Sequence, residues 1–172
     1  NGWGRAAMFW YFRPESLING VQSYFIKNHS NNQSLTYTSH TNADGNSETT
    51  ILAKNSADFD STDEFMFHIV AADAGGYNII PLNRGSWGSI FKNNDSANAD
   101  TPNNSSYYVG ISWSASMDTQ ARSRWNLVPA FDGKMPAVTP PFTVSTAGSV
   151  TYYNIENYTS SGYYITPGES YI

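Results

Sequence analysis

The chain contains no cysteine among its 172 residues, so a disulfide framework, a thiolate nucleophile and a thiolate metal site are all excluded. Charged residues are also scarce, at 13%, and the net charge is −5. Because no cluster of Lys and Arg is available to neutralise phosphates, we expect no nucleic-acid partner. No apolar run approaches the roughly 18 residues of a transmembrane helix, so we expect no membrane span.

Helical periodicity is missing as well, and short strand-like segments take its place. Clusters of Gly, Asn, Asp and Ser separate these segments, as turn chemistry requires. The pattern predicts strands near 7–13, 22–28, 34–38, 49–54, 65–70, 76–82, 88–92, 106–113, 123–128, 150–156, 162–166, and 169–172 continuing into 1–3. We therefore expect one all-β domain with twelve strands.

Three stretches of the chain, 8–16, 65–73 and 124–132, repeat the same pattern of an apolar strand with a central aromatic. The matched aromatics are Trp10, Phe67 and Trp125, at separations of 57 and 58 residues. Counting from Trp125 through both chain ends to Trp10 gives 57 again. Internal repetition of this kind indicates three similar structural units. We expect Trp10 and Trp125 to lie in the core, because both are embedded in apolar strands.

The repeats divide the chain into units at 21–73, at 75–130, and at 149–172 joined with 1–15. Residues 131–148 contain three prolines and no periodicity, which is typical of a linker. Two explanations fit this order. The chain is a ring of three units opened within the third, as in a circular permutant. Alternatively it comes from a tandem array in which 141–172 begin a second copy and another chain supplies the missing strands by swapping. We favour the ring, because the wrap-around spacing matches.

The repeated aromatic strands, together with strands of the Tyr-x-Ile type, resemble the ricin-type β-trefoil lectin-like domains. The Tyr-x-Ile strands contain Tyr24 and Ile26, Tyr77 and Ile79, and Tyr153 and Ile155. Residues 141–165 resemble the opening of divergent carbohydrate-binding modules attached to secreted bacterial glycosidases. The resemblance implies a β-trefoil of twelve strands in three pseudo-repeats, in which six strands close a barrel and three hairpins cap it.

The function implied by this resemblance is carbohydrate binding without catalysis and without a cofactor. The expected partner is a glycan or oligosaccharide, bound at up to one shallow site per unit. Few Lys and Glu among many Asn, Ser, Thr and Tyr also resemble secreted or cell-surface bacterial proteins that handle glycans. We therefore expect a secreted or cell-surface location and other domains of a larger glycan-processing protein as neighbours.

Four side chains are the candidates for contact with the sugar ring. The sugar-stacking aromatic of the family maps onto Trp113 and Trp3, with Lys54 at the corresponding place in the remaining unit. Trp87 has small Gly and Ser neighbours in the same manner. Small neighbours would leave one indole face open to the C–H groups of a pyranose. The alternative is that these indoles pack beneath hairpins, because large aromatics are usually mostly buried.

Two arginines, Arg122 and Arg124, are expected to flank a pocket near Trp113. An arginine offers a fork of donors that suits carboxylate-bearing sugars such as sialic or uronic acids. Alternatively, the arginine stems cover apolar surface at a solvated hairpin tip.

The sequence predicts neither a catalytic centre nor a metal site. The acidic segment 58–64 has carboxylates at short spacing, but we expect turn chemistry there rather than a Ca²⁺ site or an acid–base pair. The histidines are scattered over His29, His40 and His68, which does not favour metal ligation.

One departure from the family keeps a second function open. The family's fourth-strand motif is Gln-x-Trp, and the Gln position here holds Met8, Phe65 and Ser123. The alternative is therefore a protein-interaction or structural β-trefoil, an inhibitor-like loop presenter or a spacer, whose sugar sites have degenerated. A fold of this kind hosts several functions, so architecture alone does not decide between the two.

Overall fold

A computed structural model describes residues 9–29, 31–41, 45, 47–55, 65–82, 85–92, 109–129, 152–158 and 164–165. These residues form β-strands and short 3-10 helices, with no α-helix in this part of the chain. The expectation of an all-β protein is therefore confirmed. The linker at 131–148, the strand expected from 169–172 into 1–3, and both chain ends lie outside the described residues.

The strands follow the order expected from the turn signals along the chain. Their bounds are β1 (Trp10–Ile18), β2 (Val21–Asn28), β3 (Ser34–Thr41), β4 (Ser47–Lys54), β5 (Met66–Ala71), β6 (Tyr77–Pro81), β7 (Ile90–Lys92), β8 (Val109–Ile111), β9 (Trp125–Pro129) and β10 (Tyr153–Asn157). Two 3-10 helices, η3 (Ala115–Thr119) and η4 (Ala121–Ser123), lie between β8 and β9.

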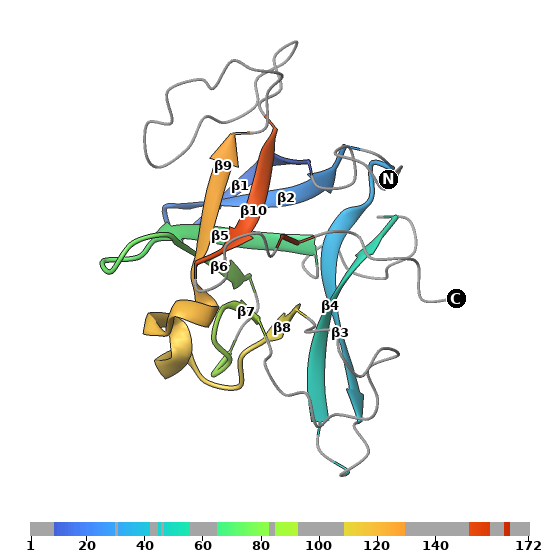
Figure 1. The fold of residues 1–172 in the computed structure, drawn as a ribbon. Coiled ribbons are helices and arrows are strands. Elements are labelled where there is room, and N and C mark those ends of the chain that lie inside the picture. Colours follow the sequence, from blue (N-terminus) through green and yellow to red (C-terminus); the bar gives the residue numbers. More distant parts are fainter. Residues whose placement is uncertain are drawn as a thin grey trace.

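Six of these strands pair into a closed antiparallel ring. The order is β1-β10-β9-β6-β5-β2, and pairing of β2 with β1 closes it. Closure of this kind leaves no free sheet edge among the six strands. The hairpin β3–β4 is attached to β2 and extends away from the ring, and the short pair β7–β8 joins β4 (Figure 1).

The register of the ring repeats three times. Each matched aromatic pairs on one side with the Tyr of a Tyr-x-Ile strand, and on the other side with the residue two positions after the Ile of another such strand. The sets are Trp10 with Tyr153 and Asn28, Phe67 with Tyr24 and Pro81, and Trp125 with Tyr77 and Asn157. The repeat seen in the sequence is therefore a repeat of strand pairing.

The core lies inside this ring. Trp10, Phe67 and Trp125 are each 0% exposed, which confirms the two expected core tryptophans. The indole of Trp10 donates to the carbonyl of Ile165 over 2.8 Å, and that of Trp125 donates to the carbonyl of Ile90 over 2.9 Å. A buried indole N–H needs such an acceptor. Each bond therefore ties a ring strand to a segment outside the ring.

The β1–β2 hairpin shows how local sequence sets this register. Ile18 pairs with Val21, so Asn19 and Gly20 form a two-residue turn. Both have positive φ, 50° at Asn19 and 78° at Gly20. Asn-Gly favours this type I′ turn, whose twist matches that of the flanking strands. The turn therefore places β1 and β2 side by side in the ring.

Candidate functional site

Trp113 has one of the most exposed large apolar side chains in the described part of the chain. It lies two residues after the end of β8 and is 67% exposed. Its ring meets the ring of Phe91 edge to face, with centroids 5.9 Å apart and an interplanar angle of 87°. Phe91 belongs to β7 and is only 3% exposed. The indole therefore packs against the buried ring of Phe91, while much of its surface faces solvent.

Arg122, from η4, completes an assembly that we call the Trp113–Arg122 cluster, made of Trp113, Arg122, Phe91 and Gln120. The guanidinium carbon lies 5.7 Å from the ring centroid of Trp113 and 5.3 Å from that of Phe91. Both distances are within the range of cation–π attraction. Nε donates to Gln120 Oε1 over 2.9 Å. The structure thus brings together Trp113 and Arg122, which are nine positions apart in the sequence.

The segment under this cluster is held by close backbone contacts. The N–H of Gly88 donates to the carbonyl of Ser112 over 2.8 Å, and the N–H of Ser89 donates to Asp118 Oδ1 over 2.8 Å. A Cβ at Gly88 would collide with Ser112 Oγ and lie 2.5 Å from the carbonyl oxygen of Ser114. Only glycine therefore lets these two segments approach so closely. Ser112 and Ser114 flank Trp113, so this contact positions the indole.

Two buried amides fasten the η3–η4 segment to the ring. Asn78, on β6, is 8% exposed, and its Nδ2 lies within hydrogen-bond distance of the carbonyls of Asp118 and Ser123, at 2.9 and 3.1 Å. Asn157, on β10, is 1% exposed and donates to the carbonyl of Arg122 over 3.2 Å. Sequence analysis did not identify either amide, because in an Asn-rich chain neither belongs to a distinctive motif.

Arg124 lies only two positions beyond Arg122 but makes different contacts. Its Nη1 donates to the carbonyls of Ala74 and Gly75 over 2.7 and 2.9 Å, and its guanidinium carbon lies 4.2 Å from the ring centroid of Tyr158. The residue is 8% exposed. Arg124 therefore holds the turn between β5 and β6, and only Arg122 takes the place expected beside Trp113.

The other predicted sugar contacts are placed differently. Trp87 is half-buried against the core, with its ring edge to face with that of Tyr37 at 6.0 Å. Lys54 ends β4 and pairs with Ser34, but its side chain lies outside the described residues. Trp3 and the acidic segment 58–64 lie outside them as well. The structure therefore offers Trp113 as the exposed indole among the described candidates.

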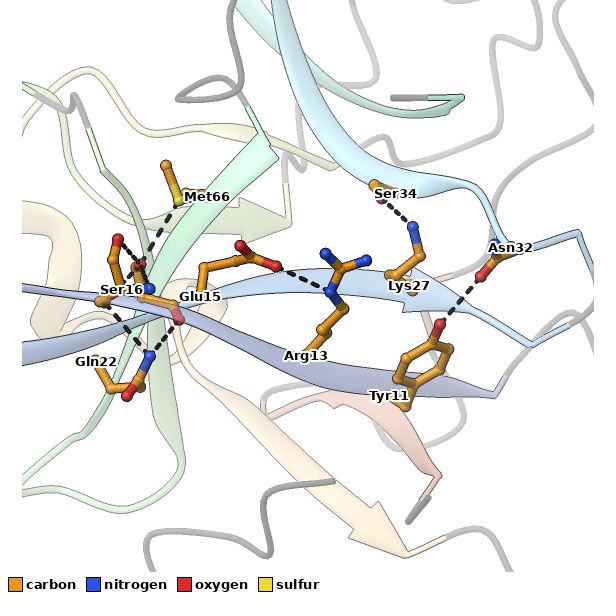
Figure 2. Close-up of polar contacts among 10 residues, drawn as sticks. Tyr11, Arg13, Glu15, Ser16, Gln22, Lys27, Asn32, Ser34 and Met66 are labelled. Atoms are coloured by element: carbon orange, nitrogen blue, oxygen red, sulfur yellow. Dashed lines mark hydrogen bonds and ion pairs between the residues drawn. The ribbon is translucent and has the colours of Figure 1, made fainter. Parts of the chain in front are cut away.

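The outer face of β1 and β2 carries a second group of charged residues (Figure 2). Arg13 forms an ion pair with Glu15 at 2.9 Å, and its guanidinium also lies over Phe25. Lys27 donates to Ser34 Oγ over 3.3 Å. Burial lowers the pKa of Lys27, and the neighbouring positive charge of Arg13 lowers it further. On this face the Arg13 charge is therefore paired with Glu15, whereas the buried Lys27 ammonium donates to a neutral hydroxyl.

No metal centre is formed by the described residues, where no three side chains of His, Asp and Glu come together. His29 packs against Tyr152, with ring centroids 4.4 Å apart. His68 lies on β5, and burial lowers its pKa. Within the same part of the chain, no helix is long and apolar enough to cross a membrane.

Comparisons with known proteins give no further guide to this site. No protein-family model, no curated protein and no solved structure matches the chain. The functional argument therefore rests on the geometry described above.

Proposed function

We propose that this chain is a non-catalytic carbohydrate-binding module with a β-trefoil architecture. Within the described residues, six strands close a ring, the register of one aromatic repeats three times, and β3–β4 and β7–β8 form hairpins outside the ring. These features support the trefoil, whose third hairpin would be formed by residues beyond Tyr164 and the N-terminal segment. The ricin-type lectin resemblance is part of the same proposal.

The observation that carries the function is the exposed indole of Trp113, at 67%, standing on buried Phe91 and held beside Arg122. A pyranose presents a face of C–H groups that packs on an aromatic ring, while polar neighbours bind its hydroxyls. Stacking costs little entropy when the ring is already fixed. The contacts of Trp113 with Phe91 and Arg122 supply that preorganisation.

A single shallow site of this kind binds weakly, with a Kd in the range of about 1 mM to 1 µM. Useful retention on a glycan then comes from several sites or several modules acting together. We therefore propose that the chain serves as a targeting module within a secreted or cell-surface glycan-processing protein.

A glycan array compares the wild type with Trp113→Ala and with Leu17→Ala. Leu17 is a matched control, because it is 68% exposed and lies on β1, away from the cluster. We expect binding by the wild type and Leu17→Ala, and a loss of at least about tenfold for Trp113→Ala, as for a hot-spot aromatic. Absence of wild-type binding, or equal binding by all three proteins, would refute the proposal.

A second candidate function is supported by three exposed aliphatic side chains on neighbouring strands. Leu17, Val21 and Val70 are 68%, 42% and 43% exposed, on β1, β2 and β5. Apolar side chains gathered at a surface are typical of protein contacts. If the chain is an interaction or spacer domain, Leu17→Asp will weaken its association with other domains of the parent protein, whereas Trp113→Ala will not.

A further inference from the structure

We infer that the Trp113–Arg122 cluster selects glycans that carry a carboxylate, such as uronic or sialic acids, over neutral glycans. This inference rests on the proposed function, because it assigns a ligand class to the same site. Its basis is a guanidinium group beside the exposed indole that forms no ion pair with any residue the structure describes.

Arg122 forms no ion pair with an acidic residue in the described part of the chain. Its Nε donates to Gln120, and neither terminal nitrogen has a hydrogen bond to a described residue. By contrast, Arg13 on β1 is paired with Glu15. Among the described residues, the guanidinium of Arg122 contacts the Gln120 amide and the two aromatic rings, none of which carries a negative charge. A ligand carboxylate would add an anionic partner to these contacts.

Arg124 shows what a structural arginine looks like in the same segment. Its Nη1 donates to two backbone carbonyls, it lies over Tyr158, and it is 8% exposed. The side chain of Arg122 donates to no backbone carbonyl of a described residue, and Arg122 is only half-buried. Arg124 is therefore a structural residue that stabilises a turn, whereas the terminal donors of Arg122 are available to a ligand.

The orientation of Arg122 suits a carboxylate. Gln120 occupies the Nε edge, while Phe91 and Trp113 lie at 5.3 and 5.7 Å from the guanidinium carbon. These contacts restrain the planar group, and no described residue forms a hydrogen bond with Nη1 or Nη2. Two parallel N–H groups match the two oxygens of a carboxylate, and such charge-assisted pairs are about twice as strong as neutral ones. A sugar stacked on Trp113 would bring a ring substituent next to this pair.

The overall charge of the chain is negative, which disfavours acidic ligands. At a net charge of −5, the chain as a whole repels an acidic glycan. Any preference for acidic over neutral sugars must therefore come from a local positive group. Arg122 is that group at the exposed indole.

The experiment uses isothermal titration calorimetry with two pairs of probes that differ in the carboxylate. One pair is trigalacturonic acid and its trimethyl ester, and the other is 3′-sialyllactose and its methyl ester. We expect the wild type to bind at least one acidic member about 10- to 100-fold more tightly than its neutral partner, as for a charged hydrogen bond. Arg122→Gln will remove this difference by weakening only the acidic ligand, and Arg122→Lys will restore part of it.

The controls separate this inference from the proposed function. Trp113→Ala will weaken both members of a pair, because both stack on the indole. If the wild type binds neutral and acidic members equally, or binds neutral glycans alone, acid selection is overturned and carbohydrate binding stands. Binding of the acid that Arg122→Gln leaves unchanged also overturns the assignment. If no glycan binds at all, the inference and the proposed function both fail.

Discussion

Replacement of Trp125 by Phe tests the threefold core in a direct way. Phe67 occupies the matching position on β5 and is fully buried, so the architecture accepts a phenyl ring there. At Trp125 the same ring would leave the carbonyl of Ile90 without the donor that now lies 2.9 Å away. The variant therefore keeps the apolar character of the position and removes one buried hydrogen bond.

The expected loss of stability has two parts. A buried acceptor left without its partner costs about 1–3 kcal/mol. The smaller ring buries less apolar area, which costs about 1 kcal/mol more. We therefore expect Trp125→Phe to lower the free energy of unfolding by about 2–4 kcal/mol, which is a large share of the stability of an ordinary domain.

Urea unfolding followed by far-ultraviolet circular dichroism measures this loss, since that signal reports mainly on the backbone and depends less on the replaced indole than fluorescence does. Trp113→Phe is the matched control, because it makes the same chemical change at a side chain that is 67% exposed. Its expected effect is within about 0.5 kcal/mol. Equal losses for the two variants would refute the reasoning, as would a Trp125→Phe protein as stable as the wild type.

Three further outcomes follow from the structure. Gly88→Ala will lower stability by about 1–3 kcal/mol in thermal unfolding, because its Cβ would meet Ser112 Oγ; unchanged unfolding would contradict the tight contact. Arg124→Ala will cost about 1.5–3 kcal/mol in urea unfolding, since two part-buried carbonyls lose a charged donor, whereas Arg122→Ala will change stability by less than about 0.5 kcal/mol; similar costs would contradict the assigned roles. Burial lowers the pKa of His68 in the folded state, so as the pH falls below about 6.5 the unfolded state binds a proton before the folded state does. Stability therefore decreases as the pH falls, and it levels off once the pH is below the lowered pKa of the folded state. His68→Asn will reduce this decrease in melting temperature between pH 7.5 and 5, and an identical pH profile would exclude the effect.

Much of the fold is predictable from the sequence because its signals are local and repeated. Alternation and turn residues placed most strands within a few residues of their observed bounds. The matched spacing of Trp10, Phe67 and Trp125 indicated three units, and the register of the ring repeats at these residues. The η3 and η4 helices were not predicted, since a 3-10 turn of three to five residues leaves no periodic pattern.

The site was less predictable, because its geometry depends on distant contacts. The sequence indicated Trp113 through its small neighbours, and Trp87 looked equivalent on the same evidence. Only packing against Tyr37 and the core distinguishes Trp87. Likewise Arg122 and Arg124 are both arginines, two positions apart. Only the structure shows that the donors of Arg124 are bonded to carbonyls of the β5–β6 turn. Such partners lie about 50 positions away along the chain.

The most direct measurement is a two-dimensional ¹⁵N–¹H spectrum of the indole N–H signals during a titration with an acidic oligosaccharide. The chain has five tryptophans, so five indole signals are expected. Our account predicts that the Trp113 signal shifts progressively, while those of Trp10 and Trp125, which are 0% exposed and hydrogen-bonded in the core, stay in place. A glycan that binds without moving the Trp113 signal would contradict the account.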